Sequence, residues 1–124
     1  MTTIDHSTSH VPVGEKVLLL LNHIKAEKRD DFEHFMQNIL APAVMRVAPD
    51  IYRRVRTLCS TQPESDGSYT YVFLIDPLMT ETSYDIEEVL HKAYPSEEAS
   101  AYLRIWNEAQ AAPQTGYEVV QSNW

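Results

Sequence analysis

A histidine at the end of the first apolar run of the sequence could move protons. His23 follows the run Val17–Leu21 and Asn22. An imidazole titrates near neutral pH, so it can act as a general base, and it can also ligate a metal or haem. Because side chains alternate along a strand, only one of Asn22 and His23 can face a given pocket. His23 is the predicted catalytic residue and Asn22 a predicted substrate-binding residue; the alternative for His23 is a hydrogen-bonded structural role.

Two arginines lie two residues apart in the next segment with strand character. Arg54 and Arg56 fall within Tyr52–Cys59, and the two-residue period of a strand places them on one face. Such a pair can clamp a carboxylate, a phenolate or haem propionates through bidentate hydrogen bonds. We therefore predict that both arginines stabilise negative charge at a site. The alternative is a surface ladder, paired across strands or across a subunit interface.

Aromatic residues could hold a ring-shaped ligand. Tyr69, Tyr71 and Phe73 alternate along a predicted strand and share one face, and Trp106 lies among the apolar positions of a predicted helix. We predict that Tyr69, Tyr71 and Trp106 contact a small aromatic ligand by stacking. The alternative is that these side chains fill the protein interior.

The remaining reactive residues are not expected to form a site. His34 lies on the polar face of a predicted helix, and His6 and His10 lie in an N-terminal segment without an apolar period. Cys59 has no neighbouring base to activate it, which favours the role of a small buried hydrophobe. With only 3 glycines, the chain also lacks a phosphate-binding loop. We therefore predict neither a metal nor a cofactor.

Charge and composition narrow the class of protein. The chain has 124 residues, with 10 Lys and Arg against 18 Asp and Glu, for a formal net charge of −8, and 44% of the residues are hydrophobic. This length and composition indicate one globular domain. The negative charge repels phosphate backbones, so nucleic-acid binding is not expected.

The cysteine content and the hydropathy of the chain indicate the cellular compartment of the protein. A single cysteine cannot form an intramolecular disulfide, which fits a reducing compartment, and the longest apolar run, Val17–Leu21, is far too short to span a bilayer. We therefore predict a cytoplasmic protein that does not associate with membranes.

The order of predicted elements indicates an α+β fold. Residues 1–14 are expected to be a flexible arm, and residues 15–124 a single domain. A proline at position 42 should break the first helix near Leu40–Ala41. The order is βαββαβ, typical of a ferredoxin-like fold with an antiparallel sheet and helices on one face. The expected elements are a strand at 17–24, a helix at 32–47, strands at 52–59 and 69–75, helices at 86–93 and 95–106, and a strand at 116–121.

A sheet covered by helices on one face only leaves its other face in need of a partner. The first strand is apolar at every position from Val17 to Leu21, so both of its faces need cover. We therefore expect a homodimer in which two sheets face each other.

With this architecture, residues 15–124 resemble the dimeric α+β barrel superfamily. The resemblance rests on the first strand with Asn22-His23-Ile24, the charged turn Lys25–Asp31, Phe32–Phe35 at the start of the first helix, and Ala41–Val44 before an arginine-rich segment. The superfamily includes antibiotic-biosynthesis monooxygenases, haem-degrading oxygenases, muconolactone isomerase-like proteins and small polyketide cyclases.

The resemblance implies a pocket between the sheet and the helices of each protomer. The expected function is a cofactor-independent monooxygenase, cyclase or isomerase acting on an aromatic or polyketide-like molecule. One alternative is a non-catalytic module that binds a small molecule or a partner protein. A second is a haem-binding, haem-degrading oxygenase, because His91 lies in the helical region where such relatives place an axial histidine. Against haem, Trp106 follows His91 instead of preceding it.

Overall fold

A computed structural model describes residues 15–79, 84–120 and 122. The predicted N-terminal arm, residues 1–14, lies outside the described residues. The elements in chain order are β1 (Lys16–Ile24), a 3-10 turn (Ala26–Lys28), α1 (Arg29–Phe35), a π-helical segment (Met36–Leu40), α2 (Ala41–Val47), α3 (Pro49–Arg54), β2 (Val55–Cys59), β3 (Tyr69–Ile75), α4 (Ile86–Ala93), α5 (Ser96–Ala109) and β4 (Thr115–Val120).

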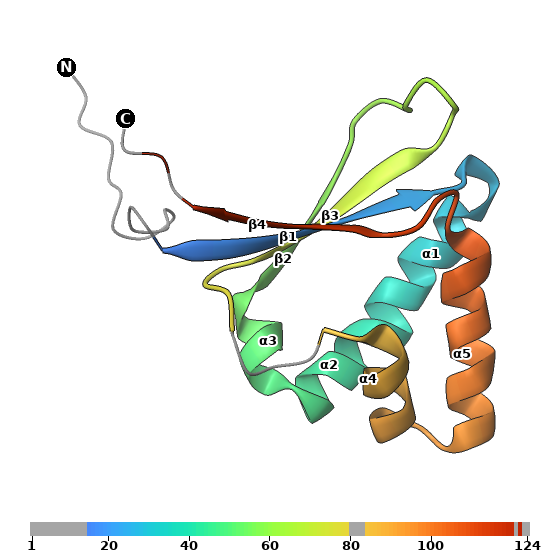
Figure 1. Ribbon diagram of the computed structural model, residues 1–124. Helices are drawn as coiled ribbons and strands as arrows, with labels where there is room; N and C mark the ends of the chain where they lie inside the picture. The colour runs from blue at the N-terminus through green and yellow to red at the C-terminus, as the bar shows by residue number, and fades with distance from the viewer. Residues whose placement is uncertain (1–14, 80–83, 121, 123–124) are drawn as a thin grey trace.

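The four strands form one antiparallel sheet in the order β2-β3-β1-β4. In the centre of the sheet, Leu20 of β1 lies opposite Phe73 of β3 on one side and opposite Gly116 of β4 on the other. The helices gather on one side of the sheet (Figure 1). The architecture is therefore α+β with an antiparallel sheet and helices, as predicted, and it is compatible with a ferredoxin-like fold.

The first helical stretch changes its hydrogen bonding next to Pro42. Between α1 and α2, the backbone N–H of Ala41 donates to the carbonyl of Met36, five residues back, so the chain forms a π-helical segment there. Proline has no backbone N–H and its ring crowds the carbonyl four residues earlier, that of Asn38. A wider turn of this kind is a known response to such an interruption. The break or kink predicted near Leu40–Ala41 is replaced by this change in hydrogen bonding, and the chain stays helical from Arg29 to Val47.

The segment Tyr52–Arg54 is helical, so the prediction of a strand over Tyr52–Cys59 was wrong in its first half. Pro49 occupies the first position of α3, where its fixed φ favours a helix and its missing N–H costs nothing. Ile51 turns into the core, and Arg53 pairs with Asp50 one turn earlier. The strand begins only at Val55.

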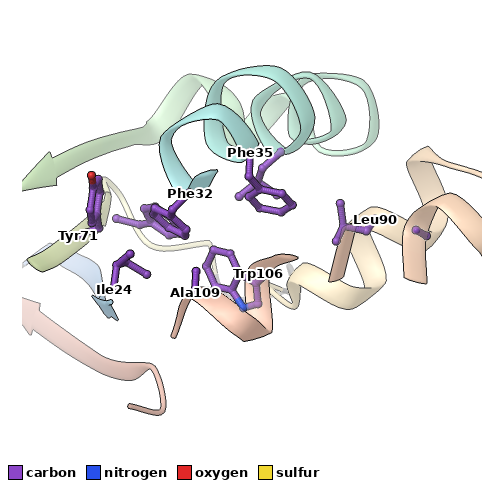
Figure 2. Close-up of a cluster of buried hydrophobic side chains, with 10 residues drawn as sticks. Ile24, Phe32, Phe35, Tyr71, Leu90, Trp106 and Ala109 are labelled. Carbon is purple, nitrogen blue, oxygen red and sulfur yellow. The ribbon is translucent and has the colours of Figure 1, made fainter. Parts of the chain in front are cut away.

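The buried core lies between the sheet and helices α1, α4 and α5. Phe32 and Phe35 of α1 and Trp106 of α5 point toward one another (Figure 2), with ring centroids of 5.6 and 6.0 Å from Trp106 to the two phenylalanines. Leu90 of α4 and Ile24 of β1 are fully buried in the same cluster. These contacts hold α1 and α5 against the sheet.

The alternation of side chains gives the sheet two different faces. One face, with Leu20, Asn22 and Ile24 of β1, is covered by the helices and contributes to the core. The other, which we call the open face, has no described helix over it (Figure 1). The open face is formed by Leu19 and Leu21 of β1, Leu58 of β2, Val72 and Leu74 of β3, and Tyr117 and Val119 of β4.

Within the described part of the chain, no helix is both long enough and apolar enough to cross a membrane.

Candidate functional site

A cavity of about 380 Å³ lies between the helix-covered face of the sheet and the helices α2, α3 and α4. This volume falls within the range of small-molecule sites. The cavity is lined by Leu20, Met36, Leu40, Ala41, Val44, Ile51, Tyr52, Val55, Thr57, Phe73, Ile75, Tyr84, Ile86 and Val89.

The lining changes from buried apolar side chains to exposed hydroxyl groups. Ile75, Leu40 and Phe73 are only 2%, 4% and 6% exposed, so they form the floor. Tyr52 is 44% exposed and Thr57 is also exposed, so their hydroxyl groups lie nearer to solvent. A ligand would therefore bury an apolar part against the sheet and keep a polar part toward the mouth.

Tyr84 closes one side of the cavity and is held in place by the backbone. Its hydroxyl accepts a hydrogen bond of 2.9 Å from the N–H of Met79 and donates one of 3.1 Å to the carbonyl of the same residue. Both hydrogen-bonding functions of this phenol are therefore used, and only its ring is offered to the cavity.

Two predicted site residues, Asn22 and Tyr71, lie together on the helix-covered face but outside the cavity. Asn22 is fully buried; its side-chain amide donates to the carbonyls of Tyr71 and Leu20, each at 3.3 Å, and its oxygen accepts from Gln114 at 2.7 Å. A buried amide with these partners fixes the position of β1 and the segment leading into β4. The contacts of Asn22 are therefore contacts within the protein.

Tyr71 and Tyr69 meet Arg29 at the other end of β3 from the cavity. The Tyr71 hydroxyl donates to Glu33 and accepts from Nε of Arg29, whose guanidinium carbon lies 4.0 Å from the centre of the Tyr69 ring. Nη2 of Arg29 also lies 3.7 Å from Sγ of Cys59. Burial and the bond to Glu33 raise the pKa of Tyr71 above its ordinary value, and the bond to Tyr71 raises the pKa of Arg29.

His23 lies on the opposite face of the sheet from Asn22, as the strand alternation predicts. It lines an open depression with Leu21, Asp66 and Thr70, among others. Hydrogen bonds from the hydroxyl and the N–H of Ser68 hold the pKa of Asp66 below its ordinary value of 3.8, and the nearby His23 adds a smaller effect in the same direction.

The two arginines do not share a strand face, which corrects the prediction of a pairwise clamp. Arg54 is the last residue of α3, whereas Arg56 is exposed on β2 opposite Leu74, on the same side of the sheet as the open face. The reason is the helical start of this segment at Pro49, which removes Arg54 from the two-residue strand period. Neither arginine lines the cavity.

Trp106 lies in the centre of the aromatic core and is only 7% exposed. Its ring faces that of Phe32 (Figure 2), with 5.6 Å between the ring centroids. The centroid of the Phe73 ring lies 6.2 Å away. Phe73 borders the cavity as well, so Trp106 supports the cavity from behind without lining it.

Metal and haem ligands are not gathered in the described residues. His91 is exposed on α4 and does not line the cavity. Over residues 15–79, 84–120 and 122, no group of three or more His, Cys, Asp and Glu side chains could hold a metal ion.

Three cavity residues with hydroxyl groups were not predicted as site residues from the sequence. Tyr52 was placed in a strand, and Thr57 and Tyr84 were not singled out at all. The start of α3 at Pro49 was the available signal for Tyr52, because proline is frequent in the first turn of helices. Tyr84 follows residues 80–83, which lie outside the described part, and no sequence pattern marks its contact with Met79.

No protein-family model and no curated protein sequence matches the chain. Among solved structures, the chain is similar to that of Rv0793 from Mycobacterium tuberculosis, with a TM-score of 0.42 and 11% sequence identity, over 90% of this chain and 98% of the other. A likeness at this level carries no information about function or assembly.

Proposed function

We propose that this chain is a homodimeric binding protein for a small, largely apolar molecule, with one ligand in the cavity of each protomer. The observation that supports it most is the cavity itself, about 380 Å³ with an apolar floor and hydroxyl groups near its mouth. Sites for small molecules have this size and this mixture of an apolar lining with a few polar groups.

Binding has more support than catalysis at this cavity. The predicted catalytic residues His23, Arg54 and Arg56 are not among the lining residues. A general base has to lie within hydrogen-bonding reach of the proton that it removes. The haem alternative has similar difficulty, since His91 is exposed on α4, away from the cavity.

The open face supports the homodimer. It presents seven apolar side chains on four neighbouring strands, and two of them, Leu58 and Tyr117, are 53% and 50% exposed. A largely apolar surface of this kind, which carries Arg56 at its β2 edge, usually marks an interaction site. A second copy offers a self-complementary surface related by a two-fold axis, as in a dimeric α+β barrel.

Ligand binding can be tested with a neutral fluorescent probe, N-phenylnaphthylamine, in a titration of the full chain. Val44 lines the cavity, and the neighbouring Met45 is 52% exposed and does not. We expect Val44→Phe to fill part of the cavity and weaken binding by about tenfold or more, while Met45→Phe binds like the wild type. Equal binding by both variants, or none by the wild type, would refute the proposal.

The dimer can be tested by sedimentation equilibrium with two variants of β4. Tyr117 lies on the open face and Val120 points to the other side of the same strand, and their exposed fractions are similar, 50% and 57%. We expect Tyr117→Glu to give monomers, because a carboxylate would be buried in the interface. Val120→Glu should remain dimeric. A monomeric wild type would exclude the homodimer without affecting the cavity.

A further inference from the structure

None of the described residues that line the cavity carries a charge. Over residues 15–79, 84–120 and 122, the lining is apolar except for Tyr52, Thr57 and Tyr84, which carry neutral hydroxyl groups. An ion moved into such surroundings loses its hydration and gains no opposite charge. This cost persists even where the protein relaxes around the ion.

None of the arginines close in sequence to the lining residues lines the cavity itself, and this includes Arg54 and Arg56, which flank Val55. Arg53 pairs with Asp50 on α3, and the guanidinium carbon of Arg46 lies 5.4 Å from the centre of the Tyr94 ring. Neither lines the cavity. The chain also carries a formal net charge of −8, which repels anions at long range. An acidic ligand would therefore meet unfavourable electrostatics both outside and inside the cavity.

Two of the three hydroxyl groups remain able to bind a ligand. The Tyr84 hydroxyl is fully used by the backbone of Met79. Within the described residues, the hydroxyls of Tyr52 and Thr57 have no hydrogen-bond partner, and both lie at the more exposed side of the cavity. Each can donate and accept one hydrogen bond or more.

Given the proposed binding function, on which this step rests, we propose that the cavity selects uncharged molecules. The ligand would place an apolar ring or chain against Phe73 and Ile75. Its single hydroxyl or carbonyl group would meet Tyr52 and Thr57 at the mouth. A carboxylate, sulfonate or phosphate attached directly to the buried part would exclude a molecule from the cavity.

Two probes with the same ring system test the selection against charge. N-phenylnaphthylamine is neutral, and anilinonaphthalene sulfonate adds a sulfonate on the naphthalene ring, where burying the rings would also bury the anion. We expect the neutral probe to bind about tenfold or more tightly than the anionic one. The difference should persist in 1 M salt, because salt screens the long-range repulsion of the net charge but does not remove the cost of desolvation.

The outcomes separate this inference from the proposed function. Equal affinity of both probes in high salt, with both weakened by Val44→Phe, would overturn the selection against charge and leave ligand binding intact. If Val44→Phe leaves the binding of the neutral probe unchanged, the proposed cavity function itself fails.

The hydroxyl groups can be tested with naphthol and methylnaphthalene, which differ by a hydroxyl in place of a methyl group. Thr57→Val and Tyr52→Phe each keep the shape of the side chain and remove its hydroxyl. We expect the wild type to prefer naphthol by about fivefold to tenfold, and the double variant to lose this preference. A preference that survives in the double variant would show that these hydroxyls do not contact the ligand.

Discussion

The hydroxyl of Tyr71 donates a hydrogen bond of 2.5 Å to Oε1 of Glu33 and so ties the middle of β3 to α1. The hydroxyl oxygen of Tyr71 also accepts a hydrogen bond of 3.2 Å from Nε of Arg29. A neutral phenol therefore stands between a carboxylate and a guanidinium, and it is itself only 2% exposed. Hydrogen bonds to charged partners are stronger than those between neutral groups, so this contact is a fixed point of the fold.

We expect Tyr71→Phe to lower the free energy of unfolding by about 1–2 kcal/mol. The substitution keeps the ring in the core and removes only the hydroxyl between Glu33 and Arg29. Urea denaturation of the full chain measures the change. Tyr69→Phe is the matched control, because the Tyr69 ring stacks on Arg29 but its hydroxyl has no partner among the described residues. A Tyr69→Phe variant as unstable as Tyr71→Phe would contradict this assignment.

We expect the stabilising contribution of the Tyr71 hydroxyl to be lost at high pH. Burial, followed by the bond to Glu33, raises the pKa of Tyr71 above its ordinary value of 10.0. A group with a raised pKa in the folded state stabilises the protein fully below its unfolded pKa, and the effect is lost as the pH rises toward the folded value. The difference in unfolding free energy between wild type and Tyr71→Phe should be constant below about pH 9 and shrink above about pH 10. A difference that does not change over this range would argue against the raised pKa.

Asn22 was predicted to bind substrate, but its hydrogen bonds are to other parts of the protein. Replacing its amide with a carboxylate tests whether the side chain is buried there. In Asn22→Asp, a carboxylate would replace the amide that donates to the carbonyls of Leu20 and Tyr71. We expect a loss of about 3 kcal/mol or more near neutral pH. Because burial beside two carbonyls raises the pKa of the new carboxyl group, part of the loss should be regained as the pH falls toward about 5. Urea denaturation at several pH values measures both effects, and Asn22→Asp as stable as the wild type at neutral pH would be inconsistent with burial.

Substitution of Trp106 distinguishes a role in packing the core from a role in contacting the ligand. Trp106→Phe should lower the free energy of unfolding by about 1–2 kcal/mol, because a smaller ring leaves space beside Phe32 and Phe35. The affinity for N-phenylnaphthylamine should change by less than about twofold, since Trp106 does not line the cavity. Thermal unfolding and the probe titration measure the two quantities on the same sample. A large loss of affinity with unchanged stability would restore Trp106 as a ligand contact.

Much of the fold follows from local patterns in the sequence. The apolar first strand and the helical period from Phe32 onward reflect the two-residue and 3.6-residue repeats of single elements. These repeats predict which side of an element is buried. They also predict correctly that Asn22 and His23 lie on opposite faces of the sheet.

The candidate site could be predicted less well, because it is formed by residues far apart in the chain. Thr57 and Phe73 meet through the pairing of β2 with β3, and Val44 and Tyr84 join them only when α2 and the segment before α4 pack against the sheet. Local periodicity does not contain these contacts. Element boundaries are also difficult to predict from local patterns, as Arg54 illustrates. The strand was predicted to start at Tyr52 but starts at Val55, so Arg54 belongs to α3 and not to the strand.

A last prediction concerns the turn that leads into β3, where Asp66 accepts hydrogen bonds of 2.6 and 2.9 Å from the hydroxyl and the N–H of Ser68. These bonds lower the pKa of Asp66 below 3.8. A carboxylate with a lowered pKa stabilises the folded state above its unfolded pKa, and the effect is lost as the pH falls through the folded value. In Ser68→Ala, which removes the largest cause, the decline in stability below about pH 4 should be shallower than in the wild type. Urea midpoints between about pH 3 and pH 6 measure this, and Ser65→Ala is the control, because Ser65 is exposed in the same turn and the hydrogen bonds to Asp66 come from Ser68. An equally steep decline in Ser68→Ala and the wild type would mean that this turn does not contribute to the acid sensitivity of the protein.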